Sequence, residues 1–254
     1  MKRIVSYTAT LVLLQTLTLS AHNASASDGL DAAPVPENRV LQPFRSVYKL
    51  TFWGFSGDGT IELRKGELPD HYVFTSISQA RGLAKLVRAN PATETTHFHV
   101  SGNELLTDEY FMDAGNGEKL ENSYARFDWE KMIAYSNHQE ERVDVPLSEG
   151  VLDRMSADLK VTLDQQDGVK PGDYRMVHRN HVKTYKFTYQ GVEKVKTPMG
   201  TFDTIKYLRQ REGSSRAATI WYAPELDYQP VKVVQTKKGR KGGTLILQSY
   251  TTNL

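Results

Sequence analysis

The sequence predicts a mainly β protein, in which an antiparallel meander forms a curved sheet, a half-barrel or a barrel. Short segments with alternating apolar and polar residues recur along the chain. They are separated by turns rich in Gly, Pro, Asn and Asp, and only one long segment has apolar residues at helical spacing. We expect that amphipathic helix to pack on the concave side of the sheet or across its open end. A sandwich is the alternative arrangement of so many short strands.

The N-terminus has the features of a cleaved signal peptide spanning residues 1–26. Lys2 and Arg3 precede a short apolar segment, and Ala24-Ser25-Ala26 fits the small-residue pattern of a cleavage site. The chain is therefore expected to be exported, to the periplasm or beyond.

Two further regions follow the signal peptide. Residues 27–43 are small, polar and rich in proline, which predicts a disordered lead-in. Residues 44–254 are long enough to bury a core and are expected to form a single β-barrel-like domain.

Composition excludes several classes of function. There is no cysteine, which excludes disulfides, thiol nucleophiles and a lipid anchor on an N-terminal cysteine. Without Lys2 and Arg3, basic and acidic residues are equal in number, so no global field favours nucleic acid. No later segment is apolar enough to predict a transmembrane span in the mature chain.

The first half of the domain reads as successive hairpins. The first reversal is expected at Ser56–Gly59, where two glycines and an aspartate tolerate positive φ. One or two helical turns are expected at Arg81–Ala89. Strands are expected at Val47–Phe55, Thr60–Arg64, Tyr72–Ser78, Thr93–Val100, Leu105–Met112, Tyr124–Trp129 and Met132–Ser136.

The longest helix is expected at Ser148–Leu163. Ser148 is a plausible N-cap, and Gly168 and Pro171 follow the helical segment. The apolar residues that would share one face are Val151, Leu152, Met155, Leu159 and Leu163.

The C-terminal part returns to strand periodicity. Turns are expected at Thr197–Gly200 and Gly213–Ser215, and Pro224 should end a strand because it has no N–H to donate. The expected strands are Tyr174–His178, Thr184–Tyr189, Val192–Lys196, Thr201–Leu208, Ala217–Ala223, a segment through Val231–Val234, and Leu245–Thr251.

Two motifs in this part resemble a known family. The turn and strand motif comprises Thr197, Pro198, Gly200, Phe202 and Lys206. The following motif comprises Ile220, Trp221, Ala223, Glu225, Leu226, Tyr228, Pro230 and Val231. Together they resemble the domain-of-unknown-function 3108 family of exported Gram-negative envelope proteins, and Gly57, Gly59, Asp153 and Ser156 also fit.

The resemblance implies a β-barrel-like fold related to envelope lipoproteins and, more distantly, to half-barrel lipid carriers. It implies no known activity, cofactor or catalytic residue. The motifs consist of turn residues and aromatics, so they specify the fold better than the function.

The search for catalytic or metal-binding groups gives only weak candidates. His97 and His99 share a face of one expected strand, and Glu94 and Glu109 could add carboxylates, but two histidines fall short of a metal site. Asp153 and Asp158 are interpreted as solvated helix charges, so no catalytic residue, metal or cofactor is expected.

Ligand binding is the favoured alternative to catalysis. The candidate residues for lining a groove are Trp53, Phe55, Phe74, Trp129, Met155, Leu159, Trp221 and Tyr222. The candidate contacts for an anionic headgroup are Lys237, Lys238, Arg240 and Lys241, in a run that otherwise reads as a solvated hairpin tip.

Three functional hypotheses follow. The first is a non-enzymatic periplasmic protein that binds an apolar or amphipathic envelope molecule, a lipid or a glycan, in a barrel groove. The second is a structural protein that docks another envelope protein. The third, less favoured, is a hydrolase acting on envelope polysaccharide or lipid.

Overall fold

A computed structural model describes residues 37–52, 55–82, 85, 90–115 and 122–252. In its first half the strands are β1 (Phe44–Phe52), β2 (Phe55–Lys65), β3 (His71–Ala80), β4 (Ala92–Ser101), β5 (Glu104–Asp113), β6 (Ser123–Asp128), β7 (Ile133–His138) and β8 (Glu141–Pro146). The second half contains β9 (Val151–Leu152), β10 (Asp173–His178), β11 (His181–Thr197), β12 (Gly200–Arg211), β13 (Arg216–Ala223), β14 (Gln229–Lys237) and β15 (Arg240–Thr252). One α-helix in the described part, α1 (Arg154–Gln166), separates β9 from β10.

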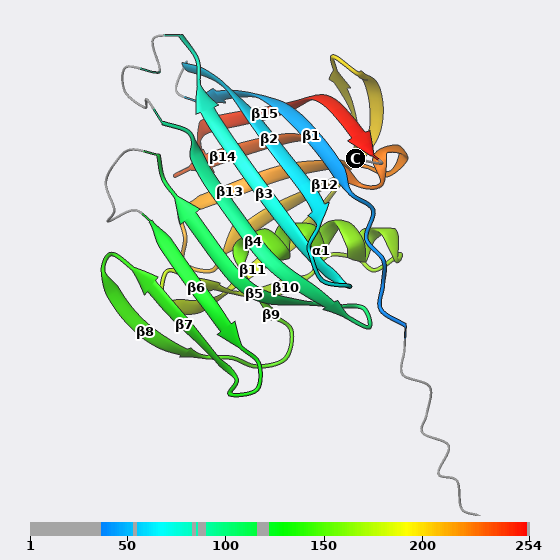
Figure 1. Cartoon of the computed structure of the whole chain (residues 1–254). Helices are drawn as coiled ribbons and strands as arrows, with labels where there is room; N and C mark the ends of the chain where they lie inside the picture. The colour runs from blue at the N-terminus through cyan, green and yellow to red at the C-terminus, as the bar shows by residue number, and fades with distance from the viewer. Residues whose placement is uncertain (1–36, 53–54, 83–84, 86–89, 116–121, 253–254) are drawn as a thin grey trace, which may run out of the picture. The chain divides into compact units, whose positions relative to one another are not determined.

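All fifteen strands belong to one curved sheet, which confirms the predicted mainly β class (Figure 1). Its order runs from β8 down to β1, crosses to β15 and then runs down to β9. Every pair is antiparallel except β9 with β10. Because neighbours in sequence are neighbours in the sheet, the hairpin meander expected from the turn residues accounts for almost the whole topology.

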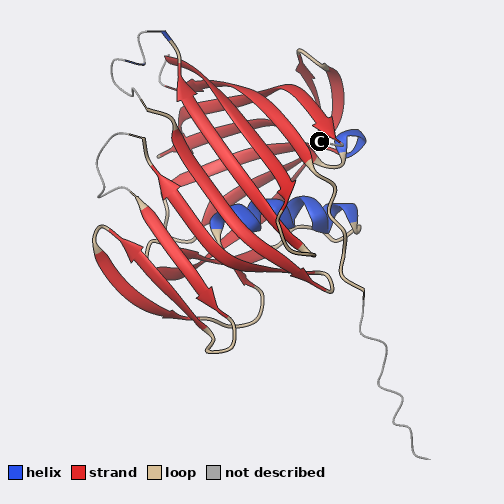
Figure 2. Cartoon of the chain, in the orientation of Figure 1, coloured by secondary structure: helices blue, strands red, loops and turns tan. Residues whose placement is uncertain are grey.

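The sheet curves around α1, which lies among the strands in Figure 2. One core cluster joins helix residues such as Leu159 to Phe98 of β4 and to Tyr207 of β12. A flat sheet could not bring these three side chains together, because β4 and β12 lie in opposite halves of the strand order.

The two end regions of the sheet are linked by side-chain hydrogen bonds through Asn180, in the β10–β11 turn. Its side-chain amide donates to the Glu141 carbonyl at 3.1 Å. Its oxygen accepts from the Ser136 hydroxyl at 2.7 Å, and Asn180 is only 5% exposed. β8 and β9 are the two ends of the strand order and do not pair with each other. The sheet is therefore not a closed barrel, although side chains connect its two end regions.

The helix begins later than predicted. Val151 and Leu152 form the short strand β9, and Asp153 is the N-cap in place of Ser148. The prediction that Asp153 is a solvated charge is wrong, because the residue is fully buried. Met155, Leu159 and Leu163 are buried as predicted, but other faces of the helix are buried too, because the sheet surrounds it.

The first reversal is also displaced. Ser56–Gly59 lie within β2 and pair with β1, so the reversal does not lie there. A Cβ on Gly57 would lie 2.6 Å from the carbonyl oxygen of Gln79. This glycine is therefore needed for close strand approach, a role that a local turn pattern does not distinguish from a reversal.

Other boundaries differ in smaller ways. The predicted strands Thr184–Tyr189 and Val192–Lys196 are one strand, β11, with a bulge between Tyr189 and Val192. The strand β8 was not predicted. The turns at Thr197–Gly200 and Gly213–Ser215 lie where expected, and Pro224 follows the end of β13.

Residues before β1 already contact the sheet. Leu41 is 3% exposed, and its N–H donates to the Tyr72 hydroxyl at 3.0 Å. Arg39 forms an ion pair with Asp167 just beyond α1. These contacts precede Phe44, where the sequence predicted order to begin.

Several predictions lie outside the described residues. They are the signal peptide, most of the lead-in, most of the Arg81–Ala89 helical segment, and Trp53. No helix in the described part of the chain has both the length and the apolarity needed to cross a membrane.

Candidate functional site

A cavity of about 710 Å³ lies at one end of strands β10 to β15. Met176, Tyr185 and Phe52 contribute apolar surface, and the β12–β13 turn at Gly213–Ser215 forms part of the wall. The strand period explains which side chains line it, because Lys183 and Tyr185 alternate in phase with the buried Phe187. Arg209 and Arg211 are in phase with the buried Tyr207 in the same way.

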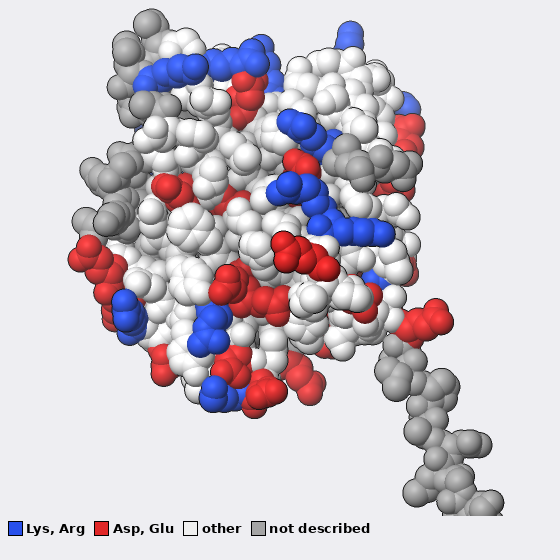
Figure 3. All heavy atoms as spheres, viewed as in Figure 1, with Lys and Arg blue, Asp and Glu red and all other residues white. Residues whose placement is uncertain are grey.

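The cavity wall is strongly cationic. Its basic residues are Arg154, Arg179, Lys183, Arg209, Arg211, Arg216 and Lys237. No acidic residue lines the cavity in the described part of the chain. By contrast, basic and acidic side chains are interspersed on the face of the molecule drawn in Figure 3.

Two of these cations have carboxylate partners on or beside the helix. The Arg154 Nε donates to Glu94 at 2.6 Å, and Arg209 donates to Asp158. Arg154 also lies 3.9 Å from Asp158. These contacts join the N-terminal part of α1 to β4 and β12, so they have a structural role.

The other five cations form no ion pair with a described residue; they are Arg179, Lys183, Arg211, Arg216 and Lys237. Burial, together with the charges of Arg211 and Arg179, lowers the pKa of Lys183. The positive charge is therefore concentrated and not internally neutralised.

The pKa of His178 also reflects the positive charge of the cavity wall. Burial lowers its pKa to about 3, with additional lowering by the surrounding cations Arg179, Arg154, Lys183 and Arg211. Its ring meets that of Tyr185 edge-on, with 6.2 Å between centroids. The imidazole is thus neutral at physiological pH, and the cavity would favour an anion.

The predicted groove-lining residues lie elsewhere in the structure. Phe74, Met155, Leu159 and Tyr222 belong to the main core cluster. Phe55 is 49% exposed on β2. None of these residues lines the cavity described above.

The predicted tryptophans lie in two smaller clusters. Trp129 packs beside Phe127 and donates from its indole N–H to the Thr107 carbonyl at 2.8 Å. Trp221 belongs to a cluster with Phe202 and donates to Glu193 at 3.1 Å. Their role in binding remains a prediction.

One residue of the predicted headgroup contact reaches the cavity. Lys237 lines it at the end of β14. Lys238, Arg240 and Lys241 are exposed around the β14–β15 turn. The other cavity cations were missed because they are scattered in sequence. Arg154 begins α1, Arg179 lies in the β10–β11 turn, and the rest lie on β11, β12 and β13.

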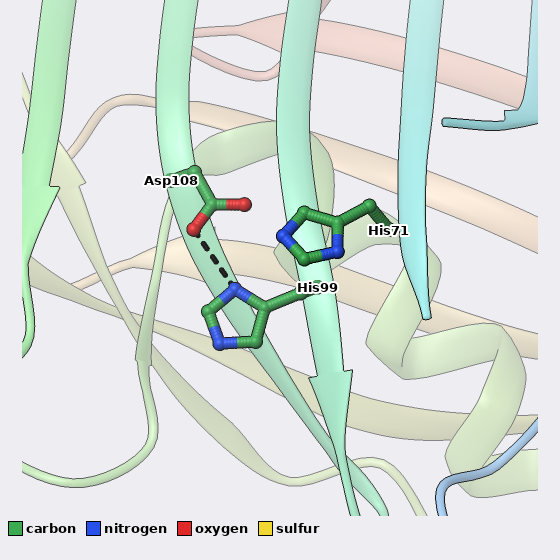
Figure 4. Close-up of side chains that lie close together, drawn as sticks. All are labelled: His71, His99 and Asp108. Carbon is green, nitrogen blue, oxygen red and sulfur yellow. Dashed lines mark hydrogen bonds and ion pairs between the residues drawn. The ribbon is translucent and has the colours of Figure 1, made fainter. Parts of the chain in front are cut away.

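A second polar cluster lies on β3, β4 and β5 (Figure 4). The His99 Nδ1 lies 2.8 Å from an Asp108 carboxylate oxygen, and this hydrogen bond raises the pKa of His99. The rings of His71 and His99 stack with 5.2 Å between centroids. Of the predicted partners of His99, Glu94 instead binds Arg154 on the concave side, and Glu109 accepts from Tyr124.

The comparisons with known proteins agree with this architecture. A family model described as "Protein of unknown function (DUF3108)" matches residues 46–244. The chain belongs to this family. No curated protein matches the DUF3108 chain.

Two solved structures are similar to this DUF3108 protein. A β-barrel-like protein of the domain of unknown function DUF1849 from Brucella abortus matches with a TM-score of 0.54 at 10% identity. That match covers 84% of this chain and 98% of the other, and it shows a shared fold. A protein from Bacteroides fragilis, named as exported and with a YmcC-like fold, has a TM-score of 0.39 at 13% identity, over 83% of this chain and 96% of the other.

Proposed function

We propose that this protein is an exported, non-enzymatic binding protein of the cell envelope, and that the cavity at the end of strands β10 to β15 holds an anionic amphipathic lipid. The observation that carries the proposal is the cavity wall, which contains seven basic and no acidic residues in the described part of the chain. Export is supported by the signal-peptide pattern of residues 1–26.

The charge of the wall argues for an anionic group. Five cations along one wall without carboxylate partners repel one another, which costs free energy. A bound phosphate or carboxylate would offset that cost, and arginine binds such groups through paired N–H donors. Arg179, Arg211 and Arg216 supply this chemistry along the wall.

The size and the apolar wall argue for a ligand with a hydrocarbon part. Small-molecule sites commonly enclose about 300 to 1,000 Å³, and the cavity falls within that range. Tyr185 and Phe52 provide apolar contacts beside the cations. Core side chains fill the sheet around α1, and the cavity lies at one end of the strands. This cavity is what favours ligand binding over docking.

The test compares two probes of the same chain length, a fluorescent fatty acid and its neutral fatty alcohol, titrated into the purified protein. The double variant Lys183→Gln and Arg211→Gln removes two unpaired cations from the wall. Fatty acid binding should weaken at least about tenfold, equivalent to about 1.4 kcal/mol. Binding of the neutral alcohol should change little.

Lys194→Gln is the matched control for this experiment. Lys194 lies on the same strand as Lys183, but its side chain is 71% exposed and pairs with Asp203 outside the cavity. Fatty acid affinity that falls equally in the control would contradict the proposal. Saturable binding of an anionic oligosaccharide, with no binding of the fatty acid, would contradict the lipid proposal and indicate that the ligand is a glycan.

A further inference from the structure

We propose that His71, His99 and Asp108 form a binding site for a divalent transition-metal ion, with Zn²⁺ as the reference case. The site lies on the outer face of β3, β4 and β5 (Figure 4). One potential ligand atom from each residue lies within 4.8 Å of the other two. This inference is independent of the cavity, because none of the three residues lines it.

The sheet register places the three side chains together. His71 and His99 are directly opposite partners on β3 and β4. Their neighbours Tyr72 and Phe98 are buried in the core, so both imidazoles lie on the convex side. Direct opposition on one face brings side chains within interaction distance without any loop rearrangement.

A β-bulge supplies the third group. His97 pairs with Glu109 and Phe98 pairs with Thr107, so Asp108 is the extra residue on β5. The bulge places Asp108 beside His99 while Thr107 points into the core, where it contacts Asp153. Bulges that redirect a side chain are frequent beside functional sites.

The proton arrangement of His71 suits metal binding. Its Nδ1 lies 2.7 Å from the Pro69 carbonyl oxygen, which can only accept, so Nδ1 carries the proton. The lone pair is therefore on Nε2. Metal-binding histidines commonly donate their second ring nitrogen to a carbonyl or carboxylate in this way, which fixes the ring and the tautomer.

The Asp108 carboxylate can only accept, so the His99 Nδ1 carries the proton of the hydrogen bond between them. The Asp108 oxygen lies 2.8 Å from the His99 Nδ1. A metal ion bound to that nitrogen takes the place of the proton, which is released to the buffer as the metal–nitrogen bond forms. Asp108 then contributes a carboxylate oxygen to the metal.

Two imidazoles and one carboxylate are a donor set suited to Zn²⁺ and neighbouring transition metals. Three protein ligands leave a coordination position for water. The side chains of His99 and Asp108 are 29% and 34% exposed, so water and the ion can reach the site.

The experiment is a ZnCl₂ titration of the chelator-treated full chain by isothermal calorimetry, repeated with Co²⁺ to record its visible absorption. The variants His71→Ala, His99→Ala and Asp108→Asn each remove one ligand. The matched control is His97→Ala, two residues from His99 on the same strand. Circular dichroism checks that each variant folds.

We expect saturable binding of one ion per chain, weakened at least about tenfold by each ligand variant. His97→Ala should bind as the unmodified protein does. The absence of saturable binding, or an equal loss in His97→Ala, would overturn the proposal. So would ligand variants with unchanged affinity and unchanged Co²⁺ absorption.

Discussion

Replacement of Asp153 by alanine should be one of the most destabilising single changes in the described part of this protein. One carboxylate oxygen accepts the Met155 and Ser156 N–H groups at 2.7 and 3.1 Å, as an N-cap does. The other accepts hydroxyl protons from Thr96 at 2.8 Å, from Thr107 at 2.6 Å and from Ser156. Asp153 thus joins the start of α1 to β4 and β5.

The expected decrease in the free energy of unfolding can be estimated from these contacts. Removing an N-cap costs about 1 kcal/mol. Each hydroxyl bond to a charged acceptor contributes about 1.5 to 3 kcal/mol. Two of the three hydroxyls have other partners, because Thr96 can donate to the Glu109 carbonyl at 3.2 Å and Thr107 to Ser156 at 3.3 Å. Counting one lost bond to the charged acceptor gives a total loss of about 2.5 to 4 kcal/mol.

Urea unfolding followed by circular dichroism measures the free energy of unfolding. Asp153→Asn should lower the free energy of unfolding by less, about 2 kcal/mol. Its carbonyl oxygen still caps the helix, but its amide group cannot accept the hydroxyl protons. Asp144→Ala, at an exposed position of β8, should change stability by less than about 0.5 kcal/mol. A loss below about 1 kcal/mol for Asp153→Ala would refute this account of helix docking.

Four other predictions concern the link between the sheet ends at Asn180, the core at Leu159, and His178 in the cavity. Asn180→Ala should lower the free energy of unfolding by about 1 to 3 kcal/mol, because the Ser136 hydroxyl and the Glu141 carbonyl lose their partner. It should also speed hydrogen exchange in β8, and unchanged exchange would contradict this. Leu159→Ala should cost about 3 kcal/mol in urea unfolding through the cavity it leaves, and a loss under 1 kcal/mol would show a loosely packed helix. The pKa of His178 is about 3 in the folded protein, below its usual value of 6.5. As pH falls, the unfolded chain therefore binds the proton before the folded protein does. The free energy of unfolding is thus highest above about pH 6.5 and decreases as pH falls toward 3. Between pH 6.5 and 4 this should amount to about 2 kcal/mol, a value reduced for solvent screening, and His178→Gln should remove that part of the pH dependence. A bound anion should raise the pKa of His178 in an imidazole NMR titration by offsetting the surrounding cations Arg154, Arg179, Lys183 and Arg211, and an unchanged pKa would contradict the proposed binding mode.

Strand periodicity and turn chemistry predicted most of the fold because both are local. The turns at Thr197–Gly200 and Gly213–Ser215 need only their own residues, and the strands between them alternate with a period of two. Gly57 was misread because its role depends on the Gln79 carbonyl of a neighbouring strand. A local pattern records that a glycine is needed without recording what approaches it.

The start of α1 shows the same limit. Val151 and Leu152 fit the apolar spacing of the helix, but they pair with Arg175 and Met176 of β10. Asp153 then acts as the cap because partners on β4 and β5 surround it. Capping residues are visible in sequence, whereas the choice between Ser148 and Asp153 is made by tertiary contacts.

The sequence could not identify the partners of His99, because they depend on the register of the sheet. His97 and His99 share a face, but the bulge at Asp108 decides which acid stands beside which histidine. His71 is 28 positions from His99 and becomes its cross-strand partner only when β3 pairs with β4. The sequence showed suitable residue types without showing this pairing.

The cations of the cavity wall fall into two groups, those with a carboxylate partner and those without one among the described residues. Arg209 and Arg154 have carboxylate partners where α1 meets the wall, as a structural interior requires. Beyond the helix the basic residues continue along β11, β12 and β13, but no described carboxylate accompanies them. A sequence selected only for stability would gain by pairing or replacing these residues, since unpaired like charges oppose folding. The arrangement is therefore best explained if a bound anion does for Arg211 and its neighbours what Asp158 does for Arg209.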